Sequence, residues 1–108
     1  MSTFTVLNPA TEEAVATVAQ ATAEQADEAV ARAVAAQPGW RAVAPADRAA
    51  LLRRFADVID AHIEELAALE VTGSGHPLGQ ARWEAGNVRD VLRYYSAAPE
   101  RLTGQQIP

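Results

Sequence analysis

The chain has 108 residues, nine arginines, no lysine and fourteen acidic residues, which give a formal net charge of −5. This length allows one domain at most, and the acidic balance argues against nucleic acid or an anionic membrane as a partner. Because cysteine and lysine are both absent, the chain excludes disulfides, zinc–thiolate sites, cysteine nucleophiles and a P-loop lysine.

Neither a membrane span nor secretion is expected. No apolar run approaches the roughly 18–20 residues that a membrane span needs. The first ten residues, MSTFTVLNPA, have neither the positive charge nor the apolar core of a signal peptide. The expected location is the cytoplasm.

Residues 3–19 are predicted to form a β-hairpin. Polar and apolar residues alternate over residues 3–7 and again over residues 14–19, which is typical of strands with one covered face. The segment between them, NPATEE, opens with Asn8-Pro9, a pair that favours turns.

A helix over residues 23–36 is predicted next. Thr22 is a favourable N-cap, and Gln25 stands three residues later, as a capping box requires. Pro38-Gly39 is expected to end this helix.

A second helix is predicted over residues 45–71. Pro45 suits the first helical position and Asp47 the first turn. The helix is expected to stop at Thr72-Gly73 because glycine is favoured just beyond a helix. Its apolar residues recur at steps of three and four: Leu52, Phe55, Ile59, Ile63, Leu66 and Leu69.

A third helix is predicted over residues 77–97, beginning at Pro77. Pro99 either ends it or begins a further short turn. The predicted inward stripe consists of Ala81, Ala85, Val88, Leu92 and Tyr95.

Residues 73–79, GSGHPLG, resemble the glycine pattern of a nucleotide-binding loop. Such a loop needs a preceding strand, so that its N–H groups converge at the start of the next helix. Here the stretch follows a predicted helix. A helix terminator at Gly73, with Pro77 starting the next helix, is therefore favoured over phosphate binding.

The other candidate polar residues favour structural roles. His62 is expected at the edge of the apolar stripe, and His76 in a loop without a second His or a carboxylate at metal-binding spacing, so no metal site is expected. Ser74 and His76 lack the G-x-S-x-G context of a hydrolase. Glu64, Glu65 and Glu70 are expected on a solvated face rather than in acid–base catalysis.

Trp83 is the most informative exception to the apolar pattern. It lies off the inward stripe, on a flank that it shares with Asn87, Asp90 and Tyr94. A large aromatic residue in such a place either packs under a loop or lines a pocket. Both alternatives stay open from the residues alone.

The ordered set of these segments resembles the NAD(P)-dependent aldehyde dehydrogenase superfamily. The resemblance runs across essentially all 108 residues, beginning with VLNPATEEAVATV and ending with DVLRYYSAAPERLTGQQIP. It implies an α/β family fold, of which this segment is mainly α: an N-terminal β-hairpin followed by three helices. It also implies that residues 1–108 are an incomplete N-terminal part of the cofactor-binding domain.

The family's chemistry uses groups that the resemblance places outside these residues. A cysteine thiolate attacks the aldehyde, hydride passes from the resulting thiohemiacetal to NAD or NADP, and water releases the acid. We therefore expect the complete enzyme to bind NAD or NADP, and this segment alone to bind neither cofactor nor aldehyde. No catalytic, cofactor-binding or metal-binding residue is assigned to it.

Two positions depart from the family's usual loop, D-x-G-K-P. Gly73 stands where an acidic residue is usual, and His76 where a lysine is usual. The acidic residue takes part in a structural monovalent cation site in some members. Its replacement argues against such a site here.

The resemblance also assigns a substrate-tunnel wall to Trp83, Glu84 and Asn87. In members that oxidise aminoaldehydes, this helix carries a tryptophan followed by an aspartate, with a second aspartate three residues on. Here Trp83-Glu84 preserves one aromatic and one acidic group, which would attract an ammonium substrate. The hypothesis is an aminoaldehyde or betaine-aldehyde-like preference.

Two functions of different classes follow. In the first, the chain is a segment of an aldehyde dehydrogenase, and its partner is the remainder of the enzyme or a homo-oligomer. In the second, it is a stand-alone, non-catalytic helical interaction module derived from the dehydrogenase. The first is favoured because an isolated two-stranded hairpin is marginally stable and the alanine-rich helices offer little apolar area.

Overall fold

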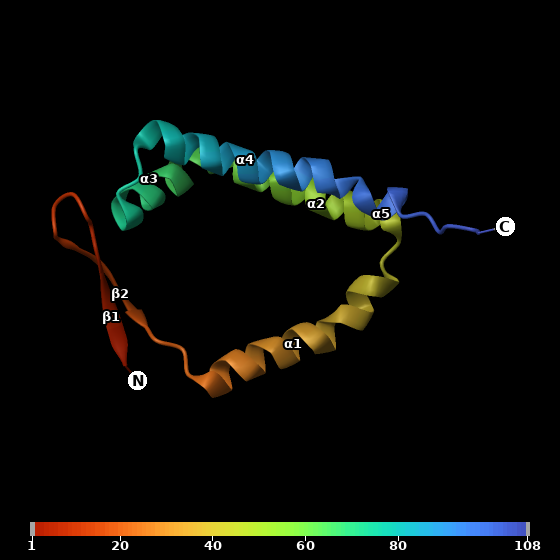
Figure 1. Ribbon diagram of the computed structural model, residues 1–108, viewed down its shortest axis with the longest axis horizontal. Coiled ribbons are helices and arrows are strands. Elements are labelled where there is room, and N and C mark those ends of the chain that lie inside the picture. The colour runs from red at the N-terminus through yellow and green to blue at the C-terminus, as the bar shows by residue number, and fades with distance from the viewer. Residues whose placement is uncertain (1, 108) are drawn as a thin grey trace.

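The structure, a computed structural model, describes residues 2–107 (Figure 1). A two-stranded hairpin leads into a series of helices, so the predicted order of elements is confirmed. The elements are β1 (Thr3–Leu7), β2 (Ala14–Ala19), α1 (Ala23–Ala42), α2 (Pro45–Ala61), α3 (Ile63–Ser74), α4 (Leu78–Ser96) and α5 (Ala98–Arg101).

The hairpin is antiparallel, and Phe4 pairs with Val18. Its turn is organised by Asn8: the Asn8 side chain accepts a hydrogen bond from the Ala10 N–H at 2.9 Å. The Asn8 carbonyl also accepts one from the Glu12 N–H at 2.8 Å. Such local side-chain bonds are the physical basis of asparagine's preference for turns. Phe4 and Val18 both remain exposed, so the apolar face of the hairpin is uncovered in this chain.

Helix α1 begins where the sequence predicts but ends later. Thr22 and Gln25 form the complete capping box, with reciprocal bonds of 3.0 and 3.2 Å. The predicted end at Pro38-Gly39 is wrong, because the helix continues to Ala42 with Pro38 inside it. Proline's fixed φ is compatible with a helix, and its missing N–H removes a single backbone bond. All residues of α1 are exposed.

The predicted helix over 45–71 is two helices. The chain breaks at His62, which ends α2 and caps α3 with φ −118° and ψ 17°. The break escapes a periodicity analysis because it spans one residue, so the stripe that contains Ile59, Ile63 and Leu66 continues almost in phase. His62 Nδ1 lies 2.9 Å from Glu65 Oε2 in the first turn of α3.

Helix α3 ends at Ser74, and the glycine beyond it is Gly75 rather than the predicted Gly73. Gly75 adopts a left-handed φ of 76°, and its N–H bonds to the Val71 carbonyl at 3.0 Å. A Cβ on Gly75 would lie 2.6 Å from Cγ of Pro9 in the hairpin turn. The glycine therefore meets two requirements, a left-handed backbone and a close approach by another segment.

Helix α4 runs alongside α2, as Figure 1 shows. Pro77 caps it, so the helix starts at Leu78, one residue after the predicted start, and ends at Ser96. Pro99 begins a short turn, α5, which decides between the two alternatives for that proline. Within residues 2–107, the buried side chains are small: Ala49, Ala56, Ala67, Ala81, Ala85 and Ser96.

The chain is extended for its length. Its radius of gyration is 18.9 Å, whereas a compact domain of 100 residues has about 13 Å. Larger apolar side chains lie at the surface, including Trp83 at 65% exposure and Tyr94 at 64%. Within residues 2–107, none of the helices combines the length and the apolar character needed to cross a bilayer.

Candidate functional site

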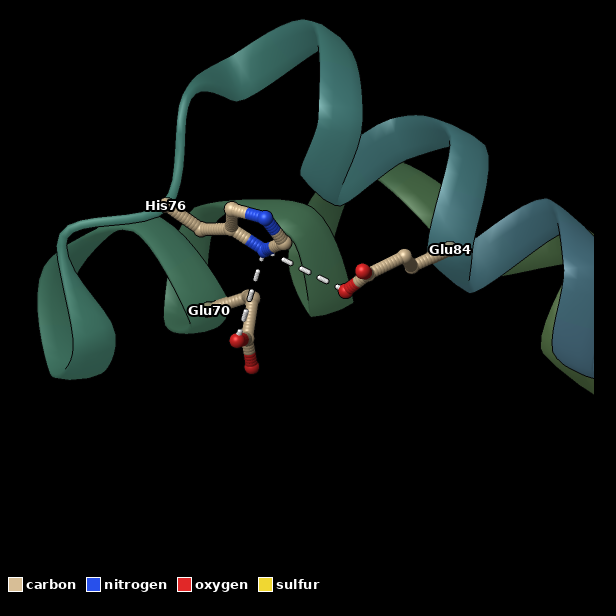
Figure 2. A group of neighbouring side chains, drawn as sticks. All are labelled: Glu70, His76 and Glu84. Atoms are coloured by element: carbon tan, nitrogen blue, oxygen red, sulfur yellow. Dashed lines mark ion pairs between the residues drawn. The ribbon is translucent and has the colours of Figure 1, made fainter.

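The most concentrated group of functional side chains lies where α3 turns into α4. His76, in the connecting loop, lies between Glu70 of α3 and Glu84 of α4 (Figure 2). His76 Nδ1 is 3.2 Å from Glu84 Oε2 and 3.7 Å from Glu70 Oε1. The three side chains are 32% to 49% exposed, so the cluster is open to solvent.

Local structure orients the members of this cluster. The Ser74 hydroxyl lies 2.8 Å from the Glu70 backbone carbonyl and 2.9 Å from Glu70 Oε1, so it supports the glutamate side chain from the last turn of α3. Gly75 then reverses the chain, and Pro77 caps α4. His76 is thus held between a left-handed glycine and a proline, two residues that restrict its placement.

The sequence shows no carboxylate at a metal-binding spacing from His76, yet the structure places two carboxylates beside it. Glu70 and Glu84 stand six residues before it and eight residues after it in the sequence. Neither interval is a helical repeat, so spacing gives no signal. The two glutamates meet because α3 and α4 pack against each other across the loop, and only the packing of the two helices shows this proximity.

An apolar groove adjoins the cluster. It has a volume of about 320 Å³ and is lined by Ile59, Leu66, Glu70, Ala81, Glu84, Ala85 and Val88. Glu70 and Glu84 therefore belong both to the groove and to the histidine cluster. The groove is walled by side chains of α2, α3 and α4.

The three predicted tunnel-wall residues do not form one group. Trp83 and Asn87 are one helical turn apart, both exposed, on the face of α4 opposite the buried Ala81 and Ala85. Glu84 lies about 100° further round the helix, beside His76 and the groove. The structure therefore places the aromatic group and the carboxylate on different flanks.

Three other carboxylates of α2 and α3, Asp57, Asp60 and Glu64, pair with arginines of α4. Arg82 Nε and Nη2 donate to both oxygens of Glu64 at 2.8–2.9 Å, and this hydrogen bonding lowers the pKa of Glu64. Arg89 Nη1 donates to Asp60 at 2.6 Å and likewise lowers the pKa of Asp60. These groups are paired as charged species, which fits the predicted structural role of Glu64 and argues against acid–base catalysis.

The glycine-containing loop is not a phosphate-binding loop. GSGHPLG starts inside α3, and its first glycine, Gly73, is helical. A phosphate loop follows a strand, whereas this stretch joins two helices. The predicted structural role of the stretch is confirmed, although Gly75 rather than Gly73 terminates the helix.

Residues 1–108 match the aldehyde dehydrogenase family along their whole length. The chain belongs to the aldehyde dehydrogenase family. It is 38% identical over 106 residues to an aldehyde dehydrogenase of Emericella nidulans, covering 97% of this chain and 21% of the relative.

Solved structures of aldehyde dehydrogenases share the fold. Succinate-semialdehyde dehydrogenase from Burkholderia pseudomallei is 34% identical with a TM-score of 0.94, over 99% of this chain and 22% of that one. An NAD-dependent benzaldehyde dehydrogenase from Corynebacterium glutamicum is 27% identical with a TM-score of 0.94, over 99% of this chain and 23% of that one. The chain thus spans about a fifth of the length of these relatives.

Proposed function

We propose that residues 1–108 are the N-terminal part of the cofactor-binding domain of an NAD(P)-dependent aldehyde dehydrogenase. In the proposal, the complete protein oxidises an aldehyde to a carboxylic acid through a thiohemiacetal. The observation that carries it is the family match over residues 1–108, which covers about a fifth of the relatives' length. The proposal includes a cytoplasmic location, which cell fractionation would test.

The reacting groups must come from the remainder of the enzyme. This chain has no cysteine, so the thiolate that attacks the aldehyde belongs to another segment. A bound NAD or NADP would accept the hydride. Within residues 2–107 the glycine-containing loop joins helices and follows no strand, which supports a dinucleotide phosphate site elsewhere in the enzyme.

The contribution of this segment is structural. Its exposed apolar side chains need a covering surface, and the remainder of the dehydrogenase is the proposed partner. The extended shape, with a radius of gyration of 18.9 Å, supports this role because a self-sufficient domain of this length would be more compact. Exposed apolar residues lie on the hairpin and on α1: Phe4, Leu7, Val15, Val18, Val30, Val34 and Trp40.

The proposal extends to the substrate entrance. Trp83, with Asn87 one turn away, would face the tunnel, and Glu84 would add a carboxylate from the neighbouring flank of α4, which favours aminoaldehydes. Trp83 is 65% exposed, so it does not contribute to the packing of α4 on α2. This exposure supports contact between Trp83 and another part of the enzyme or its substrate. The experiment is the ratio of kcat/KM for an aminoaldehyde to that for an alkyl aldehyde, measured in the complete enzyme.

Trp83→Ala and Glu84→Gln should each lower this ratio. Trp40→Ala, at the other tryptophan, should leave it unchanged and serves as the matched control. An unchanged ratio in Trp83→Ala and Glu84→Gln would remove the aminoaldehyde preference while leaving the family activity in place.

The central proposal is tested by the size of the native protein. An antibody against residues 23–36, used on a cell extract, should detect a band near four to five times 11.5 kDa, as the 21% share of the curated relative indicates. A band at 11.5 kDa would instead favour the non-catalytic interaction module.

A further inference from the structure

We propose that Glu70, His76 and Glu84 bind one divalent transition-metal ion of the zinc class. The three residues offer one ligand atom each, and these atoms lie within 4.8 Å of one another. Imidazole nitrogen and carboxylate oxygen are ligands that zinc and its neighbours accept. Figure 2 shows the contacts from the same nitrogen of the His76 ring to both glutamates.

The distances suit ligands of one ion. With metal–ligand bonds of about 2.1 Å, two ligands of a tetrahedral site stand about 3.4 Å apart. His76 Nδ1 lies 3.2 Å from Glu84 Oε2 and 3.7 Å from Glu70 Oε1, on either side of that value. The three ligand atoms lie within 4.8 Å of one another, so an ion would draw the two carboxylates closer together, which flexible glutamate side chains allow.

The contacts of His62 provide an internal contrast. His62 Nδ1 lies 2.9 Å from Glu65 Oε2 and forms a hydrogen bond with that single carboxylate. His76 Nδ1 instead faces two carboxylates, at 3.2 Å from Glu84 and 3.7 Å from Glu70. His62 is therefore engaged by one carboxylate, whereas His76 is shared between two.

The charge of the cluster favours a cation. Two ionised carboxylates face one imidazole, which carries at most one positive charge. The arginine of the same turn, Arg82, is directed to Glu64 instead, in a bidentate pair. A divalent ion would balance both carboxylates.

The surroundings also resemble those of a metal ligand set. The Ser74 hydroxyl lies 2.9 Å from Glu70 Oε1, and such outer hydrogen bonds orient ligating groups. The solvent exposure of the cluster leaves room for water to complete the coordination. An ion here would join the end of α3 to the first turns of α4, so binding should raise the melting temperature of the chain.

The test uses the purified native protein that contains residues 1–108, freed of metal with a chelator and titrated with Zn²⁺ by calorimetry. We expect one ion per chain, a rise in melting temperature, and with Co²⁺ a visible absorption band typical of a low-coordinate site. His76→Gln and Glu84→Gln should each weaken Zn²⁺ binding at least tenfold. His62→Gln is the matched control and should bind as the parent chain does.

Glu84→Gln is the more secure variant because the side chain lies on an exposed face of α4, and its helical content is checked by circular dichroism. The proposal is overturned if the parent chain binds no Zn²⁺, if Glu84→Gln or His76→Gln binds as tightly as the parent, or if Mg²⁺ binds equally well. These measurements need no aldehyde or nucleotide, so they are independent of the proposed dehydrogenase activity.

Discussion

Pro9 and Gly75 touch across the fold: a Cβ added to Gly75 would lie 2.6 Å from the Pro9 Cγ. Pro9 belongs to the hairpin turn, and Gly75 follows α3 with φ 76°. The close approach joins the N-terminal hairpin to the loop that carries His76. Pro9 is part of the sequence NPAT and Gly75 is part of GSGHP. These two turn-forming segments are therefore in contact.

Gly75→Ala should destabilise the chain. A left-handed alanine costs about 1–2 kcal/mol, and displacement of Pro9 should add to this. Gly73→Ala is the matched control because Gly73 is helical and has open space around its Cβ position; it should stabilise the chain by about 0.5–1 kcal/mol. Urea unfolding measures both changes.

Part of the destabilisation in Gly75→Ala should come from the contact with Pro9. The double variant Pro9→Ala, Gly75→Ala measures this part. We expect partial recovery of the free energy of unfolding, because the smaller side chain removes the close contact but not the backbone strain. Equal effects of Gly73→Ala and Gly75→Ala would contradict the assignment of Gly75 as the helix terminator.

The ion pairs between α4 and the helices before it should make stability depend on pH. Arginine hydrogen bonds hold the pKa values of Asp60 and Glu64 below the ordinary carboxyl range. The stabilisation is therefore complete above the unfolded values, about pH 4 to 5. It is lost as the pH falls through the lower folded values, because the native carboxylates must then be protonated.

Melting temperatures measured from pH 7 to pH 2 test this dependence. Asp60→Asn should flatten the profile below about pH 4. Glu28→Gln, on the exposed helix α1, should leave its shape unchanged. If both variants keep the parent profile, the Arg89–Asp60 pair contributes nothing measurable in solution.

Alanine at the helix contacts sets how closely α2 and α4 approach. Ala56 is 0% exposed, so Ala56→Leu should force the helices apart and cost about 1–3 kcal/mol. Ala50→Leu, an exposed position of the same helix, should change the free energy of unfolding by less than about 0.5 kcal/mol. Thermal unfolding followed by circular dichroism compares the two variants. An unchanged free energy of unfolding in Ala56→Leu would mean that α2 and α4 are not closely packed at this residue.

Helix α1 should be the least protected of the long helices. Its residues are all exposed, so its stability depends on local features such as the Thr22 capping box. Thr22→Ala should cost about 1 kcal/mol of helix stability and speed amide exchange across α1 but not across α4. Exchange in α1 as slow as that in α4 would show that α1 is covered in solution, for example by self-association.

Local signals in the sequence identified where elements begin. Thr22 with Gln25, Pro45 and the Asn8-Pro9 turn all act through bonds or dihedral restrictions within a few residues, and the structure has elements starting or turning at each. The family resemblance was also visible in the order of these segments, and the match over residues 1–108 confirms it.

Where elements end was harder to predict, because several local signals compete. Pro38 could end a helix, yet α1 incorporates it at the cost of a backbone bond. Gly73 and Gly75 could each end α3. The helix ends at Gly75, which is the glycine that lies against Pro9. The break at His62 leaves the apolar period almost unchanged, so periodicity could not show it.

The sequence by itself determined the hairpin, the helical character and the family, because these depend on neighbouring residues and their order. Only the tertiary structure decided that His76 lies between Glu70 and Glu84 and that Glu84 lies on a different flank from Trp83. The physical reason is that helix packing brings together side chains whose spacing follows no repeat. The spacing of residues in the sequence therefore does not predict which of these side chains lie close together.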